Sequence, residues 1–514
     1  MNLLAKIKSV SSFKLDLAAN FAGVGWSALL QIACVPLYLK FLGIEAFGLI
    51  GFYLMLQSLL QVLDFGLSPT MNREMARYSV QPEKAAEARD LVRTLEAGYW
   101  LVGIAIGMAM FAAAPAIGTH WIKAGSIPAR GVQHTLMLMG LLTVLQWPAS
   151  FYQGGLMGLG RQVLFNGLSI FFSTLSSAGS VLILWLVSPT IEAFFLWLAA
   201  VNAARITILA ALLWHSLPWA NRASRFDIAR VRSIGRFAVG MSGITVCALI
   251  LTQSDKVLVS KFFSLKVFGY YSIGGMFGTG LSMVVTAVFN TIFPRFSALA
   301  AADEDALKAF YYRCTQLMAV LILPLAVVLA LFSTEILQLW TRNAEVARNA
   351  GPIAALLVVG SALNGLMNLP YALQLAYGWT SIGLRICIFL MALSIPSLWL
   401  MSKYYGAVGA ACVWPGMNAV YMLVGVTLTH RRLLKGGAMR WWGEVSLPLV
   451  PVLLVVVIGK GLVSHSMSPP LAICVLSVLL FCATGAAALV SPAVRSWLFY
   501  RLVGGEAALI REQR

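Results

Sequence analysis

Charged residues are scarce in this sequence. Asp, Glu, Lys and Arg make up only 11% of the 514 residues and hydrophobic residues 60%, whereas charged residues form about a quarter of a soluble domain. The chain also lacks runs of alternating polar and apolar residues. Instead, continuous apolar stretches recur along it, and about 20 such residues cross a ~30 Å hydrocarbon core as a helix. We therefore predict an all-α polytopic membrane protein and exclude a membrane barrel.

Features of enzymes and metal proteins are absent as well. The seven cysteines stand singly in apolar stretches, which excludes a disulfide framework or a zinc site. The five histidines are dispersed, and the phosphate-binding pattern G-x-x-x-x-G-K-[ST] does not occur. No predicted loop is long enough for a folded soluble domain. We therefore predict no enzyme, no cofactor and no metal site.

Acidic residues are few, with 19 Asp and Glu against 37 Lys and Arg, a net charge of +18. The cations gather in alternate loops between apolar stretches, as they do when cytoplasmic loops retain positive charge during insertion. This pattern predicts that both termini are cytoplasmic, and it argues against a nucleic-acid partner. The first apolar run is long and is followed at once by another, so we expect no cleavable signal peptide.

The apolar stretches predict about fourteen transmembrane helices. Their approximate ranges are 17–39, 47–67, 95–118, 132–153, 164–187, 191–214, 237–259, 268–292, 315–335, 350–374, 382–401, 407–429, 444–463 and 471–494. The predicted organisation is an interfacial amphipathic helix (1–16), a six-helix N-lobe (17–214), a basic cytoplasmic linker (215–236), a six-helix C-lobe (237–429), two extra helices (430–494) and a cytoplasmic tail (495–514).

A short segment occurs twice. Lys40–Gly48 and Lys261–Gly269 are 221 residues apart, match at four of nine positions and each join two apolar stretches. Short loops between membrane helices are often rich in Gly, Phe and Lys, which is the alternative explanation. If the repeat is an internal duplication, it predicts two similar lobes with the working site between them. An even number of helices separates the copies, so the lobes should be related by an axis along the membrane normal.

Three motifs resemble one family. These are the two repeated segments, Asp64-Phe65-Gly66-Leu67 followed by Arg73-Glu74, and Tyr405-Gly406-Ala407-Val408-Gly409-Ala410-Ala411. Together they resemble the polysaccharide-transporter branch of the multidrug/oligosaccharidyl-lipid/polysaccharide (MOP) exporter superfamily, the O-antigen and exopolysaccharide flippases of bacterial inner membranes. The resemblance covers most of residues 10–430. It implies a V-shaped, MATE-like fold with a cationic central cavity and alternating access.

The resemblance also implies a function. Such flippases move a polyprenyl-pyrophosphate-linked oligosaccharide from the cytoplasmic to the outer leaflet, for O-antigen of lipopolysaccharide or for exopolysaccharide. The energy source is left open between substrate supply and a gradient of H⁺ or Na⁺. Expected partners are the lipid-linked oligosaccharide and the bilayer, and a polymerase or other polysaccharide-assembly proteins are candidates.

Two other functions are alternatives to the flippase. A cation-coupled multidrug exporter of the same superfamily is expected to carry acidic residues deep in the first or seventh helix. The first has none, and Asp255 in the seventh has Lys256 beside it. A membrane polymerase or glycosyltransferase would need a large extramembrane loop with carboxylates or a metal site. Both alternatives are less well supported than the flippase.

Candidate substrate-binding cations lie within or beside the predicted helices. A buried cation is costly in a membrane and therefore marks a candidate site. Arg205, in the middle of the sixth helix, is the first candidate because its planar fork suits a phosphate; pairing inside the lobe is the alternative. Lys256 is a second phosphate candidate, with Asp255 beside it for ion coupling or for holding a cation in place. The alternative is that both side chains reach water at the outer interface. Arg73 is a third candidate substrate-binding cation. With Asp64 it is also a candidate gate pair, or else the two lie at a solvated helix end.

Polar uncharged side chains inside the predicted helices are candidates to bind sugar hydroxyls. Asn364 and Asn368 are four residues apart and so share one helix face. Amides also join membrane helices structurally, which is the alternative role. The predicted polar lining of the cavity comprises Asn20, Gln31, Gln146, Tyr152, Asn364 and Asn368.

Overall fold

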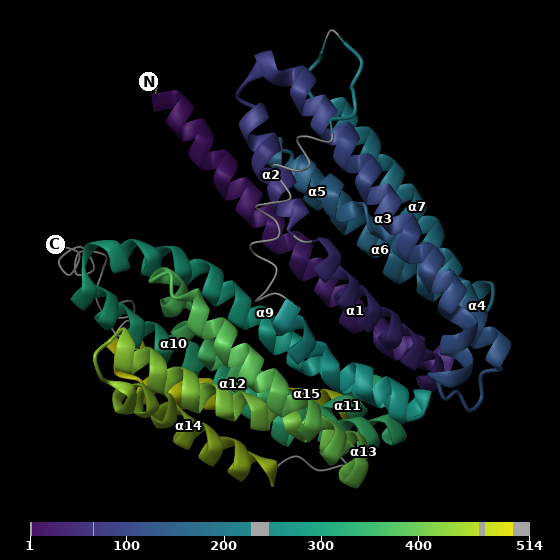
Figure 1. The fold of residues 1–514 in the computed structure, drawn as a ribbon. Helices are drawn as coiled ribbons and strands as arrows, with labels where there is room; N and C mark the ends of the chain where they lie inside the picture. Colours follow the sequence, from purple (N-terminus) through teal and green to yellow (C-terminus); the bar gives the residue numbers. More distant parts are fainter. Residues whose placement is uncertain (1–2, 65, 221, 228–245, 462–467, 497–514) are drawn as a thin grey trace. The chain divides into compact units, whose positions relative to one another are not determined.

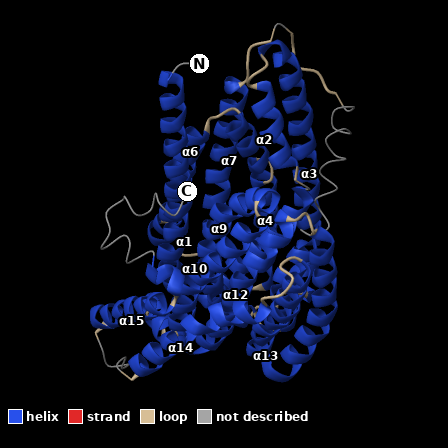
Figure 2. Ribbon diagram, turned by 90° about the vertical axis from the view of Figure 1, so that its left-hand side faces the viewer, coloured by secondary structure: helices blue, strands red, loops and turns tan. Residues whose placement is uncertain are grey.

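The computed structural model describes residues 3–64, 66–220, 222–227, 246–461 and 468–496, without the side chains of residues 3–22, 62, 82 and 380. In these ranges the chain is helices joined by loops, with no strand (Figure 2). Eleven of the described helices are long and apolar enough to cross a membrane. The predicted all-α polytopic membrane class is confirmed. The count of fourteen stays a prediction, and part of the predicted seventh helix lies outside the described residues.

The chain forms two compact units. Unit 1 comprises Met1–Leu249 and Ser260–Gly269, and unit 2 comprises Ile250–Val259 and Tyr270–Arg514. The predicted boundaries of the lobes, the linker and the tail remain predictions. The predicted interfacial helix 1–16 falls at the start of α1, where side chains lie outside the described part.

Unit 1 holds the first part of the chain (Figure 1). Its elements are α1 (Leu3–Leu60), η1 (Gln61–Asp64), α2 (Leu67–Tyr78), η2 (Pro82–Lys84), α3 (Ala85–His120), α4 (Ala129–Gln146), α5 (Ala149–Gly158), α6 (Gln162–Leu186) and α7 (Ile191–Ser216). Helix α3 packs against α4, α4 against α7, and α1 against α6.

Unit 2 holds most of the remaining helices. Residues 246–262 are helical, and the helices that follow are α9 (Leu265–Ala302), α10 (Glu304–Leu331), α11 (Ser333–Thr341), α12 (Ala344–Ala376), α13 (Thr380–Arg432), α14 (Ala438–Lys460) and α15 (Pro469–Val490). The first residues of α9, as far as Gly269, belong to unit 1. Helix α12 packs against α13, and α14 packs against both α10 and α15.

Glycine interrupts the two longest helices. Gly43 in α1 has φ 76° and ψ 172°, and Gly406 in α13 has φ 65° and ψ −149°. Residues with a Cβ rarely adopt these angles, so glycine is required there. A continuous helix of 58 residues would be about three times as long as a ~30 Å hydrocarbon core is thick. Each glycine therefore separates two apolar segments, where the sequence predicts a boundary between two transmembrane helices.

Local sequence sets several helix starts. The Asn343 side chain accepts hydrogen bonds from the backbone N–H of Glu345 and Val346, at 3.0 and 3.1 Å, and so caps α12. Asp303 caps α10 in the same way. Helix α7 begins after Thr190, whose Oγ1 accepts from Ala193 N.

Each unit has a hydrophobic core of its own. In unit 1 the core joins α2, α3, α5 and α7, with Met71, Val92, Phe151 and Leu213 fully buried. In unit 2 a large cluster joins α9, α10, α12, α13 and α14. A second cluster there packs α14 and α15 onto α10. The two C-terminal helices are thus built into unit 2. All seven cysteines are described, and none of them forms a disulfide.

The two copies of the repeated segment contact each other within unit 1. A Cβ placed on Gly48 would collide with the backbone oxygen of Leu265, and one placed on Gly269 would collide with that of Ile44. Ile44 and Leu265 occupy the same position in the repeat, as do the two glycines. This exchange of equivalent contacts is what a twofold axis between two copies of one segment produces. It supports the interpretation of the repeat as a duplication.

Neighbouring loops hold the second copy in place. Lys123 O accepts from Leu265 N at 2.9 Å, and Lys123 Nζ donates to Phe262 O at 3.0 Å. Trp121 Nε1 donates to Ser260 Oγ at 3.1 Å. The loop after α3 therefore contacts the backbone of Phe262 and Leu265, so these two hydrogen bonds do not depend on the side chains of the second copy.

Candidate functional site

Arg205 lies near the middle of α7. At 1.5 Å per residue it is about 21 Å from the first residue of the helix and about 16 Å from the last. The helix packs against α4, α5 and α6. Arg205 is partly buried, and among the described residues no hydrogen bond or ion pair to it is present. An arginine placed so far from either helix end, with no partner among the described residues, is available to an anionic ligand.

Asp255 and Lys256 of unit 2 have different partners. Tyr271 OH donates to Asp255 Oδ2 at 2.7 Å, while Asp255 Oδ1 is buried with no hydrogen-bond partner in the described structure. Lys256 Nζ donates to Gln253 Oε1 at 3.1 Å. A carboxylate with one buried, unpaired oxygen can accept a proton or contribute to a cation site.

The candidate gate residues Asp64 and Arg73 also have separate partners. Asp64 Oδ1 accepts from Tyr99 OH at 2.5 Å, and Asp64 Oδ2 accepts from Ser68 N at 3.3 Å. Arg73 pairs with its neighbour Glu74 at 2.8 Å and is half exposed. Asp64 thus lies in a polar contact between η1, α2 and α3.

Tyr152 and Gln146 take part in contacts inside unit 1. Tyr152 is fully buried, and its OH donates to Glu96 at 2.6 Å. Tyr53 OH donates to Gln146 Oε1 at 2.7 Å. Both arrangements match the structural alternative for these residues. Their role in lining a cavity remains a prediction.

The amides of unit 2 form a chain between two helices. Asn364 Nδ2 donates to Asn418 Oδ1 at 2.9 Å, and Asn368 Nδ2 donates to the Asn364 backbone oxygen at 2.9 Å. Asn364 and Asn368 are partly buried. Gln31 is exposed on α1, and the Asn20 side chain lies outside the described residues.

The sequence did not single out the buried carboxylates of α3. Glu96 accepts from Tyr152 OH and from Trp214 Nε1, the latter at 3.2 Å. Asp90 forms a bidentate ion pair with Arg222 and accepts from Arg225 N at 2.7 Å. Asp90 stands in the charged run before the third apolar stretch, and Glu96 stands at the start of that stretch. Only their partners, distant in sequence, show that they are buried.

Asp90 and its neighbours also fix the start of the predicted linker on unit 1. Arg89 Nε donates to Pro218 O at 2.8 Å, and Thr94 Oγ1 accepts from Asp227 N at 3.0 Å. No group of three or more metal-ligating side chains occurs in the part of the chain that the structure describes.

Known proteins resemble both the sequence and the fold. A family model described as "Polysaccharide biosynthesis protein" matches residues 39–341, more than half of the chain. The chain belongs to this family. The family match agrees with the resemblance seen in the repeated segments and in the residues after Asp64.

Two curated relatives carry transporter names. The succinoglycan biosynthesis transport protein ExoT of Rhizobium meliloti (strain 1021) is 24% identical over 318 residues, which cover 59% of this chain and 58% of that protein. A putative O-antigen transporter of Shigella flexneri is 24% identical over 179 residues, covering 35% of this chain and 42% of that protein. These names agree with the prediction of a transporter rather than an enzyme.

Solved structures show the same fold. An inward-facing MATE-family multidrug transporter of the MOP superfamily matches with a TM-score of 0.66 at 13% identity, covering 80% of this chain and 95% of that one. The lipid II flippase MurJ, in an inward closed conformation, matches with a TM-score of 0.65 at 11% identity, covering 95% of this chain and 99% of that one. At such identities the likeness concerns the fold alone. It confirms the predicted MATE-like fold of a multi-pass membrane protein.

Proposed function

We propose that this protein is a flippase that moves a polyprenyl-pyrophosphate-linked oligosaccharide from the cytoplasmic to the outer leaflet of a bacterial inner membrane. Membership of the polysaccharide biosynthesis family, and relatives named for succinoglycan and O-antigen transport, support a saccharide cargo. The fold shared with a lipid II flippase supports a cargo that is linked to a lipid. Both termini are cytoplasmic in this proposal.

The single observation that carries the proposal is Arg205. A pyrophosphate cannot enter hydrocarbon without a compensating charge, because the desolvation cost of an unpaired anion is very large. The Arg205 guanidinium offers a fixed fork of donors that matches phosphate oxygens. Among the described residues, Arg205 has no partner that a phosphate would have to displace. Arg205 is therefore the phosphate ligand that unit 1 contributes.

Unit 2 contributes a different set of groups. Lys256 is a second phosphate ligand, and Asp255, with its unpaired Oδ1, is the residue that takes up the coupling H⁺ or Na⁺. The amides of Asn364 and Asn368 provide donors and acceptors for sugar hydroxyls. In this scheme cargo and ion act on neighbouring residues of one helix, which would couple their movements.

The test is a flipping assay in vesicles that hold a fluorescent polyprenyl-pyrophosphate oligosaccharide. We expect Arg205→Ala to lower the initial rate of flipping roughly 10- to 100-fold, because it removes a charge-assisted hydrogen bond to the phosphate in a dry site. Arg205→Lys should retain part of the activity, because it keeps the charge but not the fork. Arg348→Ala, at an exposed arginine of α12, is the matched control and should flip normally. Equal rates for Arg205→Ala and Arg348→Ala would exclude Arg205 from transport.

A further inference from the structure

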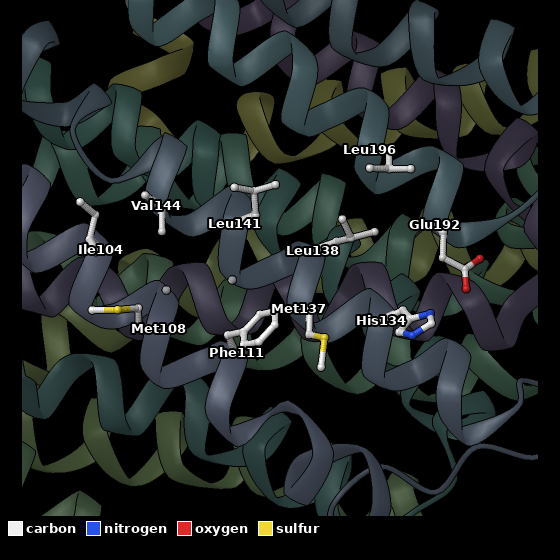
Figure 3. Close-up of a pocket in the computed structure, with 12 residues that line it drawn as sticks. Ile104, Met108, Phe111, His134, Met137, Leu138, Leu141, Val144, Glu192 and Leu196 are labelled. Atoms are coloured by element: carbon white, nitrogen blue, oxygen red, sulfur yellow. The ribbon is translucent and has the colours of Figure 1, made fainter.

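Unit 1 carries a groove of about 710 Å³ that opens between α3, α4 and α7. Most of its lining is apolar, and Glu192 and His134 lie together at one end, whereas Ile104 and Val144 lie at the other (Figure 3). The lining residues are Ile104, Gly107, Met108 and Phe111 of α3; His134, Met137, Leu138, Gly140, Leu141 and Val144 of α4; and Glu192 and Leu196 of α7. We call this surface the α3/α4/α7 groove.

Within the groove, α3 and α4 approach each other closely at two glycines, Gly107 and Gly140. A Cβ on Gly107 would collide with the Val144 side chain and lie 3.2 Å from the Gly140 oxygen. The larger apolar side chains stand around this crossing, among them Met108 at 62% exposed and Phe111 at 56%. In a membrane-spanning chain such exposed side chains meet lipid instead of water. An apolar groove of this size would hold a hydrocarbon chain.

The polar end of the groove lies where α4 and α7 begin and α3 ends. Glu192 is in the first turn of α7, and its Oε1 is 3.4 Å from the Cβ position of Gly131 in the first turn of α4. Arg130 does not line the groove, but it precedes His134, which does, by four residues, so the two share one face of α4. Within the described structure neither Glu192 nor Arg130 has an ion-pair partner. One acid in the groove and one base beside it are thus both available near this end.

We infer that the α3/α4/α7 groove binds one phospholipid with an ethanolamine headgroup. An acyl chain lies along the apolar lining, the lipid ammonium faces Glu192, and the lipid phosphate faces Arg130 and His134. The charges of the site match this headgroup in sign, an acid for the ammonium and a base for the phosphate. A glycerol headgroup has no ammonium to pair with Glu192. A polyprenyl pyrophosphate would place a second anion beside the Glu192 carboxylate, which would repel it. This site is separate from Arg205 and does not depend on the proposed cargo.

Photo-crosslinking tests the site. The full-length protein is reconstituted in vesicles with phosphatidylethanolamine that carries a diazirine in one acyl chain, and the labelled peptides are mapped. We expect label on 104–111 and 137–144, stronger than with phosphatidylglycerol carrying the same diazirine. Glu192→Gln should reduce the ethanolamine-lipid label roughly two- to fivefold, as for a partly exposed ion pair. The matched control Glu335→Gln, an acid in the first turn of α11, should leave it unchanged.

A second variant separates binding from folding. Leu196→Trp, at a side chain that is 54% exposed on the groove, should block labelling while the helix content stays that of the wild type. Leu182→Trp, 49% exposed on α6 and outside the groove, should label normally. Equal labelling by both phospholipids would identify the groove as an unselective bilayer contact and overturn the proposal. Preferential labelling by a diazirine polyprenyl pyrophosphate, or no label on these peptides, would overturn it too.

Discussion

The contact between the two copies of the repeated segment predicts a measurable cost for one added methyl group. In Gly48→Ala the new Cβ would press on the Leu265 oxygen and lie 3.0 Å from Leu265 Cδ1. In Gly269→Ala it would press on the Ile44 oxygen and lie 3.1 Å from Ile44 Cδ1. The obstacle in both cases is backbone, which cannot rotate away. The two segments would have to separate by about 1 Å, which costs about 1–3 kcal/mol for overpacking of this kind.

The reciprocal contact also predicts how the losses from the two variants compare and combine. Because the two variants strain equivalent contacts, we expect similar losses from each, and less than their sum from the double variant. The loss of stability is measured by thermal unfolding of the purified protein, read as the fraction that stays monodisperse after heating. A loss of 1 kcal/mol lowers the unfolding midpoint by about 2–4 °C for a unit of this size. Gly275→Ala is the matched control, because no atom lies within 4 Å of its Cβ position. It should stabilise α9 by about 0.5–1 kcal/mol. Midpoints for Gly48→Ala and Gly269→Ala equal to that of Gly275→Ala would refute the reciprocal contact.

Three further substitutions test other parts of the structure. Tyr152→Phe removes a donor from the carboxylate of Glu96, and the expected loss is about 1–3 kcal/mol in thermal unfolding. Asp90→Asn breaks the bidentate pair with Arg222, so limited proteolysis should cut residues 217–227 several-fold faster. Gly43→Ala forces an alanine into a conformation with φ 76°, which should cost about 1–3 kcal/mol.

Each of these has a control at an exposed or unstrained site. Tyr405→Phe, at a side chain 67% exposed, should leave the unfolding midpoint unchanged. Glu83→Gln, at an exposed residue of η2, should leave the cleavage rate as in the wild type. Gly25→Ala, with nothing within 4 Å of its Cβ position, should not destabilise α1. A variant that behaves like its control would contradict the corresponding contact.

The sequence predicts the fold class well because lipid imposes a length and an apolar composition on each membrane helix. The boundary between the first two predicted helices coincides with the break at Gly43, and that between the eleventh and twelfth lies next to Gly406. The repeated segment is also visible in the sequence. The contact between its two copies is not, because it joins residues 221 positions apart.

Side-chain partners are much harder to predict in such a chain. Helices that are apolar on every side have no polar face to indicate their rotation, so the pattern does not say which neighbour a polar residue meets. Tyr152 meets Glu96, and Asn364 meets Asn418, through packing between separate helices. Neither acceptor was a candidate in the sequence. Arg205 can be identified as a candidate from the sequence because a single cation within an apolar stretch is unusual in itself, whatever its neighbours are.

The most direct test of the account is flipping by the wild-type protein. Vesicles containing a fluorescent polyprenyl-pyrophosphate oligosaccharide are treated with a reductant that cannot cross the bilayer and bleaches only the outer leaflet. We expect the protected half of the signal to disappear in vesicles with the protein and to persist in protein-free vesicles. Persistent protection in both, together with export of cationic dyes by the protein, would contradict the lipid-linked cargo.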